Sequence, residues 1–205
     1  MISTYFKHVG FLLILFAIAC SKKDSITTVF SEEGNKISEG LLINNKKEGF
    51  WIEFAPNGDT LSKAFYKKDT LNGIFYYYED NAIDESRTYR NGIENGKRVL
   101  YYPDGQILAE GNFFNGSQQG KWISYYENQK IKAVSTYENG RPIDQSVNYY
   151  INGKVETFVE YRDSIIFVKY FDSLENVAWH FNLKDGVIVD TIEFNQEIVD
   201  LIYKP

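Results

Sequence analysis

The stretch Gly120-Lys121-Trp122-Ile123-Ser124-Tyr125, followed by Tyr137-Glu138-Asn139-Gly140, decides the fold because versions of it recur along the chain. A glycine that opens an aromatic-rich run returns with spacings of 24, 23 and 24 residues, at Gly49, Gly73, Gly96 and Gly120. Two further markers share this period. They are a turn pair (Asn57-Gly58, Asn81-Ala82, Asp104-Gly105, Asn128-Gln129, Asn152-Gly153) and an aromatic residue before a second turn (Tyr66, Tyr89, Phe113, Tyr137, Tyr161). Three markers in one register indicate a repeat array over about residues 31–164.

Each repeat contains two short β-prone runs separated by turn residues such as Asn-Gly or Asp-Gly. These dipeptides accept the positive φ values of a type I′ turn, which is the commonest tight hairpin connection. A turn about every twelve residues therefore predicts an antiparallel meander with two strands per repeat. At about 4.8 Å per strand, the sheet advances nearly 10 Å per repeat, so the array is elongated. The fold class is all-β.

The repeated residues resemble MORN repeats, specifically the variant with the pattern Gly-x-Trp-x-x-Tyr, Asn-Gly, then Tyr-x-Asn-Gly. Residues 120–125 and 137–140 match this pattern fully, and residues 49–54 match with Phe54 in place of Tyr. Residues 96–101 depart from it, because Arg98 stands where Trp is usual. The resemblance covers about two thirds of the chain and implies a sheet-building repeat. Members of this bacterial family often carry an automatic antitoxin label, which fits a secreted lipoprotein badly.

Composition excludes several kinds of chemistry. The 205 residues include 28 acidic and 22 basic side chains, two His and one Cys, and 17% of the chain is aromatic. A net charge of −6 argues against nucleic acid, because phosphate binding needs clustered Lys and Arg. One Cys cannot form an internal disulfide, and the chain lacks a Cys/His set for structural zinc. No cofactor or metal is expected.

The N-terminus is predicted to be a secretory signal that ends at the only cysteine. Lys7 and His8 precede an apolar run over residues 9–19, which is too short for a stable transmembrane helix. Ala17-Ile18-Ala19-Cys20 resembles the lipobox of bacterial lipoproteins, with Ala17 in place of the usual Leu. That resemblance implies cleavage before Cys20 and acylation of Cys20 as a lipid anchor. The alternative is ordinary signal cleavage nearby, with Cys20 a free thiol.

The predicted domains follow from these motifs. Residues 1–19 are the signal peptide, 20–30 the acylated Cys and a polar tether, 31–164 the repeat array, and 165–205 a β-rich C-terminal cap. The cap includes residues 197–203, which fit an edge strand or a short helix. Ser21 after the Cys favours the outer membrane by the lipoprotein rule, and the leaflet stays open. Without Lys7 the charge balance is −7, one below the −6 of the whole chain.

The repeated aromatic residues suggest a binding face. A sheet one layer thick has little to bury its second face against, and rows of partly exposed rings are typical ligand platforms. The alternative is cross-strand aromatic pairing that only stabilises the sheet, by ~0.2–1 kcal/mol per pair. The residues predicted to form the binding face are Trp51, Phe75, Tyr77, Tyr102, Trp122 and Tyr126.

Catalytic motifs are absent from the sequence, and His180 fits a half-buried or surface strand residue. The predicted function is a non-enzymatic, membrane-anchored repeat lipoprotein of the cell envelope that binds a protein or acts as a scaffold. The alternative is a module that binds a glycan or lipid surface through the aromatic face, although the acidic charge argues against anionic lipids. A hydrolase using carboxylate pairs such as Glu32-Glu33 or Glu79-Asp80 ranks last, because turn chemistry explains both pairs.

Overall fold

The computed structural model describes residues 24–162, 164–172, 174 and 177–194. These residues form fifteen β-strands and no helix. The predicted signal peptide, the predicted lipid anchor at Cys20 and the predicted edge strand or helix at residues 197–203 lie outside the described part of the chain. The strands are β1 (Ser25–Phe30), β2 (Lys36–Ile43), β3 (Lys46–Phe54), β4 (Thr60–Lys67), β5 (Thr70–Glu79), β6 (Ala82–Arg90), β7 (Ile93–Tyr101), β8 (Ile107–Phe114), β9 (Ser117–Tyr125), β10 (Ile131–Glu138), β11 (Arg141–Tyr149), β12 (Val155–Arg162), β13 (Ile165–Phe171), β14 (Val177–Lys184) and β15 (Val187–Phe194).

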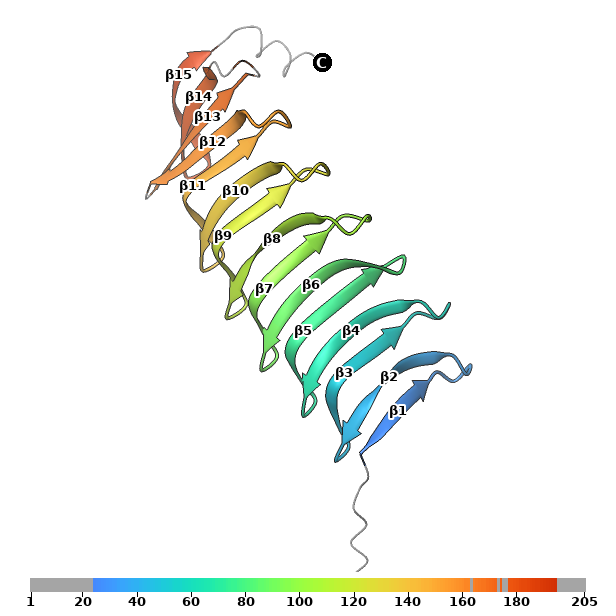
Figure 1. The fold of residues 1–205 in the computed structure, drawn as a ribbon. Coiled ribbons are helices and arrows are strands. Elements are labelled where there is room, and N and C mark those ends of the chain that lie inside the picture. Colours follow the sequence, from blue (N-terminus) through green and yellow to red (C-terminus); the bar gives the residue numbers. More distant parts are fainter. Residues whose placement is uncertain (1–23, 163, 173, 175–176, 195–205) are drawn as a thin grey trace, which may run out of the picture.

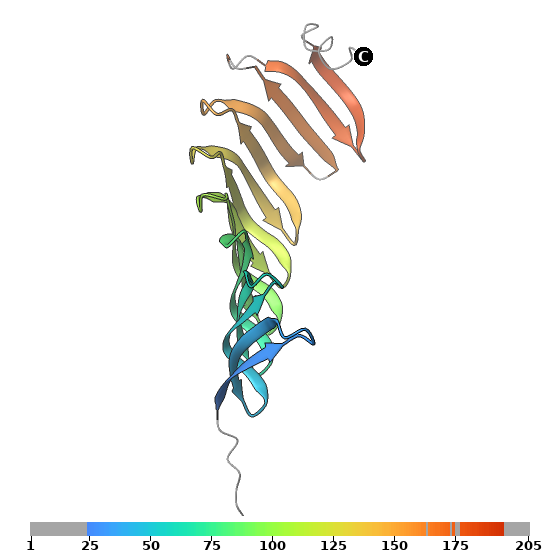
Figure 2. The ribbon, with the colours of Figure 1, turned by 90° about the vertical axis from the view of Figure 1, so that its right-hand side faces the viewer.

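All fifteen strands belong to one open sheet in chain order from β1 to β15, and each strand pairs antiparallel with its neighbours. The prediction of an all-β antiparallel meander is therefore confirmed. Figure 1 shows an elongated ladder with hairpin turns along both long sides. In the view turned by 90°, the first strands are seen from the edge and the last strands from the face, so the sheet twists along its length (Figure 2).

The hairpin turns differ between the two long sides of the sheet. On one side, two-residue turns have positive φ at both positions, for example 52° and 80° at Asn91-Gly92. These are the expected type I′ turns, and Gly92 N also donates to the carbonyl of Leu71 in the preceding repeat at 2.8 Å. The same link recurs at the neighbouring turns, from Asp69 N to Lys47 O, Gly116 N to Glu94 O and Gly140 N to Gln118 O.

On the other side, the type I′ prediction for Asn57-Gly58 is wrong. Ala55 N bonds to Asp59 O at 2.8 Å and Gly58 N to Ala55 O at 2.9 Å, so the connection is a longer loop with Gly58 at φ 92°. The equivalent loops at Gly105 and Gly153 are built in the same way. The shortened repeat departs from this pattern, because Asp80-Asn81 there forms a two-residue turn with φ 49° and 64°.

The repeat glycine marks a bulge in the first strand of each hairpin. Gly96 has φ 128°, and the register between β6 and β7 shifts between Arg87 and Tyr89. An L side chain rarely adopts such a φ, and an extra residue at this point bends the strand. Asp144 replaces the glycine in the fifth repeat and still has φ 57°. The period of the glycines therefore reflects a bulge that curves each hairpin in the same way.

Burial is sparse because the sheet has no second layer. Among the described residues, the buried apolar side chains are Trp51, Ala64, Val99, Val168, Ala178 and Phe181. Four of these lie in one cross-strand row. On β2 to β8 the row consists of Gly40, Trp51, Ala64, Phe75, Arg87, Arg98 and Gly111. On β9 to β14 it continues with Trp122, Ser135, Ser146, Val159, Val168 and Phe181. We call the side of the sheet that carries this row the aromatic face.

Two tryptophans of this row lie flat on the strand before them. Trp51 is only 3% exposed, and its Nε1 donates to the carbonyl of Leu41 at 3.0 Å. A Cβ added to Gly40 would lie 2.4 Å from the Trp51 ring, and one added to Gly111 would lie 2.2 Å from the Trp122 ring. Both glycines are therefore needed for space. The pairs Gly40–Trp51 and Gly111–Trp122 give a single-layer sheet a local core.

Replacement of Gly111 by Ala is expected to lower the free energy of unfolding by about 1–3 kcal/mol, because overpacking displaces the Trp122 ring or the strand. Chemical denaturation followed by circular dichroism measures this. In a Trp122→Ala background the same substitution should cost much less, since the ring that it meets is gone. An equal cost in both backgrounds would show that the clash does not determine the choice of glycine.

The N-terminal end of the array differs from the predicted domain boundary. Residues 25–30 were assigned to the polar tether, but they form β1, which pairs with β2 from Ser25↔Leu42 onward. An alternation of Thr and apolar residues in Ile26-Thr27-Thr28-Val29-Phe30 explains this strand. At the other end, the described part of the predicted β-rich cap forms β13 to β15, which continue the same sheet. Within the described residues, no helix is long and apolar enough to cross a membrane.

Candidate functional site

The six residues of the predicted binding face do not lie together in the structure. Trp51, Phe75, Tyr77 and Trp122 are strand residues of the aromatic face. Trp51 is too buried to touch a ligand, Phe75 and Trp122 are half-buried, and Tyr77 is 43% exposed. The aromatic face therefore offers ring edges rather than a row of open rings.

Tyr102 directly follows β7 and Tyr126 directly follows β9. Both tyrosines therefore lie in the longer loops that connect these strands to β8 and β10, and not in the strands themselves. The hydroxyl of Tyr102 donates to the carbonyl of Tyr125 at 2.8 Å, and that of Tyr126 to the carbonyl of Tyr149 at 2.6 Å. Tyr150 repeats the contact to Phe171 O at 2.8 Å. These tyrosines link each repeat to the next, which accounts for their periodic spacing without a ligand.

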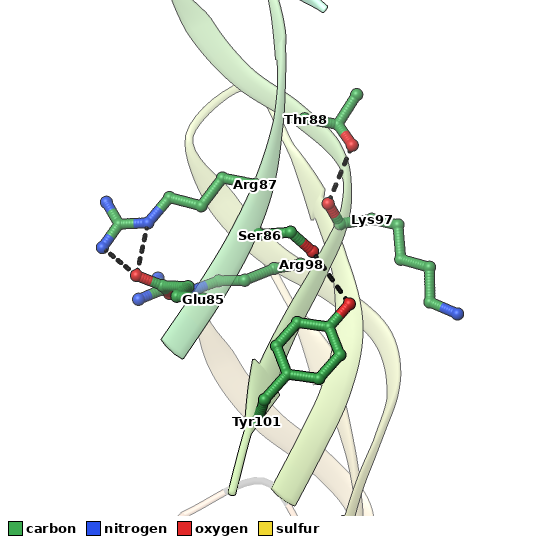
Figure 3. A network of polar contacts seen from close by, with 7 residues as sticks. All are labelled: Glu85, Ser86, Arg87, Thr88, Lys97, Arg98 and Tyr101. Atoms are coloured by element: carbon green, nitrogen blue, oxygen red, sulfur yellow. Dashed lines mark hydrogen bonds and ion pairs between the residues drawn. The ribbon is translucent and has the colours of Figure 1, made fainter. Parts of the chain in front are cut away.

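The most unusual feature of the aromatic face is a charged cluster in the middle of the array. Arg87 on β6 pairs directly across from Arg98 on β7, at row positions that hold Ala64 and Phe75 one repeat earlier. Both guanidinium groups bind the carboxylate of Glu85, whose side chain is 8% exposed. Figure 3 shows the two arginines converging on Glu85 on one side of the strands.

The contacts within this cluster are short and charge-assisted. Arg87 donates from Nε and Nη2 to Glu85 Oε2 at 2.8 and 2.5 Å, and Arg98 donates from Nε to Oε1. The hydrogen bond to Glu85 raises the pKa of Arg87 well above its usual range, against the opposing effect of burial. Like charges directly across a sheet are destabilising, so Glu85 is the group that allows two arginines to face each other.

Glu94 adds a second carboxyl group to the cluster. Burial raises the pKa of Glu94, while the charges of Arg98 and Arg87 oppose this. Its Oε1 is buried and has no hydrogen-bond partner among the described residues. The cluster therefore combines two guanidinium groups, one fully engaged carboxylate and one carboxyl group whose protonated form is favoured by desolvation.

Aromatic rings border the charged cluster on both sides. The Arg98 guanidinium lies over the Phe113 ring at 5.4 Å, and Phe113 packs edge-on against Trp122 at 5.7 Å. On the other side, Phe75 and Tyr89 form an edge-on pair at 6.2 Å. The arginine side chains are 33% and 24% exposed for Arg87 and Arg98, so their outer edges reach the solvent.

The opposite face carries a separate polar set around the same strands. Ser86 lies 3.4 Å from the Tyr101 hydroxyl, and Thr88 donates to the carbonyl of Lys97 at 2.9 Å (Figure 3). Lys97 pairs with Glu110 at 2.7 Å beside an open hollow of about 300 Å³. The Lys97 side chain is 60% exposed, and an ion pair with so exposed a member contributes little to the stability of the fold.

The residues that the sequence offered for chemistry lie on separate parts of the sheet. The described residues contain no group of three or more His, Cys, Asp or Glu side chains that could hold a metal ion. His180 is half-buried on β14, as the sequence predicted, with its Nδ1 buried and unpartnered. Glu32, Glu33, Glu79 and Asp80 are exposed at or beside turns.

Sequence reasoning missed the Glu85–Arg87–Arg98 cluster, although it noted Arg98 as a departure from the repeat pattern. The signal that could have revealed the cluster lies in the second strand of each repeat, at positions 85 and 87. Position 87 is Gly, Ala, Ser or Val in the other repeats (Gly40, Ala64, Gly111, Ser135, Val159), and position 85 is Ser, Ala or Thr (Ser38, Ser62, Ala109, Ala133, Thr157). Three charged residues replace one aromatic and two small residues on the adjacent strands β6 and β7.

Comparison with known proteins agrees with the geometry of the central hairpins. Residues 94–115 and 118–139 match the model of the MORN repeat variant family. These segments hold β7 to β10, and the same register recurs in the hairpins on either side. A search of curated proteins finds no match to the chain. The fold and the match define the class of the molecule as an all-β array that contains MORN-type repeats, a class of scaffold and binding modules.

Proposed function

We propose that this protein is a non-enzymatic scaffold of the bacterial cell envelope, held by a lipid on Cys20 and binding a partner protein along its sheet. The observation that carries the proposal is the extended single-layer sheet, whose aromatic face presents a charged cluster between ring pairs. A surface of this length offers many contact points along the described strands. Recognition rather than catalysis is the function that such a surface supports.

The position of Cys20 supports an anchoring role. Only residues 21–24 separate it from β1, which begins at Ser25. At about 3.3–3.6 Å per extended residue, the first strand would lie within about 20 Å of the acyl chains. Several acyl chains at about 0.8 kcal/mol per buried CH₂ hold a protein on a membrane stably. Ser21 favours the outer membrane as the location.

Two measurements test this proposal in cells that make the full chain. Metabolic labelling with an alkyne fatty acid should label the native protein, and Cys20→Ala should abolish the label and release the protein from the membrane fraction. Capture from detergent-solubilised envelope should then retain the same protein partner with the native chain and with Cys20→Ala. Unlabelled native protein would refute the anchor, and the absence of a retained partner at every detergent strength would refute the scaffold.

Glycan recognition is the second candidate, because Tyr77 is exposed beside the half-buried ring of Phe75 on the aromatic face. The buried Trp51 would not report such binding, so Trp122 is the residue whose fluorescence should respond. A response of Trp122 to a neutral glycan, together with no captured protein, would favour this candidate over the scaffold.

A further inference from the structure

The arginines of the central cluster keep hydrogen-bond donors that Glu85 does not use. A guanidinium group carries five N–H donors. Glu85 takes Nε and Nη2 of Arg87 but only Nε of Arg98. The hydrogen bonds formed by the described residues leave both Nη groups of Arg98 unused, and its side chain is 24% exposed. A second acceptor can therefore approach Arg98 from the solvent without displacing Glu85.

The charge of the cluster favours a singly charged acceptor. Two guanidinium groups face the carboxylate of Glu85 and a second carboxyl group, Glu94, whose Oε1 is buried. The two arginines bring two positive charges to one place in a chain of net charge −6. A carboxylate fits an arginine fork by two parallel hydrogen bonds. A phosphate dianion would meet more repulsion from the two neighbouring glutamates than a carboxylate does.

The surroundings favour an acid that is part of an extended polypeptide. The Phe75–Tyr89 pair lies on one side of the arginines and the Phe113–Trp122 pair on the other. Adjacent strands are about 4.8 Å apart, so Phe75 lies roughly 7 Å from the midpoint of the two arginines. In an extended peptide, side chains at i and i+2 also lie about 6.6–6.8 Å apart on one face. In an apolar–x–acid–x–apolar sequence, one apolar residue therefore matches the spacing from Phe75 to the arginines. The Phe113 ring, 5.4 Å from the Arg98 guanidinium, lies within reach of the other apolar residue.

We propose that Arg87 and Arg98 form a carboxylate-binding site for an acidic residue in an extended segment of the partner protein, with apolar neighbours of that residue packed on the flanking rings. Arg98 donates to the incoming carboxylate, and Glu85 holds both arginines in position. This inference rests on the proposed protein-binding function and names the chemistry of the partner. It also explains why one repeat has lost its aromatic–glycine pair in exchange for charges.

A pair of short peptides tests the site directly. The probe is a fluorescein-labelled peptide Gly-Phe-Thr-Glu-Thr-Phe-Gly, and its counterpart has Gln in place of Glu. Fluorescence anisotropy with the full chain in detergent should show at least tenfold tighter binding of the Glu peptide, weakening as salt screens the charges. Arg98→Gln should remove this preference. Lys97→Gln, which loses the same charge from the opposite face of the same strand, should leave the preference unchanged.

A second variant that keeps the fold shows whether a lost preference in Arg98→Gln comes from the missing arginine or from a loss of structure. The triple substitution Glu85→Ala, Arg87→Gly and Arg98→Trp installs the residues found one repeat later at Ala109, Gly111 and Trp122. It should fold and bind both peptides equally weakly. Equal binding of the two peptides by the native chain, or a persistent preference in the folded triple variant, would overturn the proposal, as would tighter binding of an acidic polysaccharide such as alginate.

The two proposals fail in different ways. If the envelope partner is captured equally by the native chain and the triple variant, the scaffold stands and the carboxylate site is wrong. If the Glu peptide is preferred and no envelope partner is retained, the site stands and the scaffold assignment is wrong.

Discussion

Replacement of Glu85 by Ala alone is expected to lower the free energy of unfolding by about 3 kcal/mol. Arg87 and Arg98 lie directly opposite each other, and the substitution removes the carboxylate that binds both. Removing one partner of a buried ion pair costs about 3–5 kcal/mol, and the lower end applies because both arginines are partly exposed. Urea denaturation followed by circular dichroism measures the change.

Two matched variants separate charge pairing from the loss of a side chain. Glu110→Ala removes a glutamate on the opposite face that pairs with the mostly exposed Lys97 and accepts a hydrogen bond from the Tyr125 hydroxyl at 3.0 Å, and it should cost no more than about 1 kcal/mol. In the triple variant Glu85→Ala, Arg87→Gly, Arg98→Trp, the free energy of unfolding should fall by no more than about 1 kcal/mol. The reason is that packed apolar groups replace a buried ion pair at little or no cost. A small loss in Glu85→Ala, or a large loss in the triple variant, would contradict this account.

The stability of the triple variant bears on why the cluster exists. A buried ion pair is weak evidence for a stabilising role, since apolar residues of similar volume often stabilise as well or better. If the neighbouring repeat's residues fit this position without loss, stability does not explain the charges. The recognition of an acidic partner does, because only the charged version presents the free Nη groups of Arg98.

Sequence periodicity predicted the meander because one hairpin geometry recurs at each repeat glycine. Where the period holds, the turns fall where the aromatic marker places them, as after Tyr89, Phe113 and Tyr137. Alternation along a strand was less informative at the strand ends. It placed Tyr126 on the same face as Trp122, but the pairing of β9 with β10 begins at Tyr125↔Ile131, and Tyr126 lies in the loop beyond it. Side-chain alternation has no meaning once the ladder ends.

The charged cluster was harder to predict for a different reason. The bulge at Gly96 decides which residue of β7 faces Arg87, because it shifts the register between Arg87 and Tyr89. Glycine periodicity shows that a bulge exists but not which pairs it creates. Exposure was also misjudged at Trp51, since the space above Gly40 that buries its ring belongs to a different strand. Local pattern predicts elements, whereas the register between elements determines the site.

Replacement of Trp51 by Ala is expected to destabilise the first repeats by about 3–5 kcal/mol, the usual cost of removing a buried Trp. The ring is 3% exposed, lies on Gly40 and donates to the Leu41 carbonyl, so the substitution leaves an uncovered backbone and an unpaired acceptor.

The loss should be local, because each repeat contacts only its neighbours. Hydrogen exchange should therefore accelerate over β2 to β4 and stay unchanged over β9 to β12. The matched control is Phe50→Ala. Phe50 is the adjacent residue, 45% exposed on the opposite face, and its edge-on contact with Phe65 should limit the cost to about 1.5 kcal/mol or less. Equal destabilisation by the two substitutions would mean that the aromatic face does not hold the array together, and the Gly40–Trp51 pair would lose its role as the local core of the first repeats.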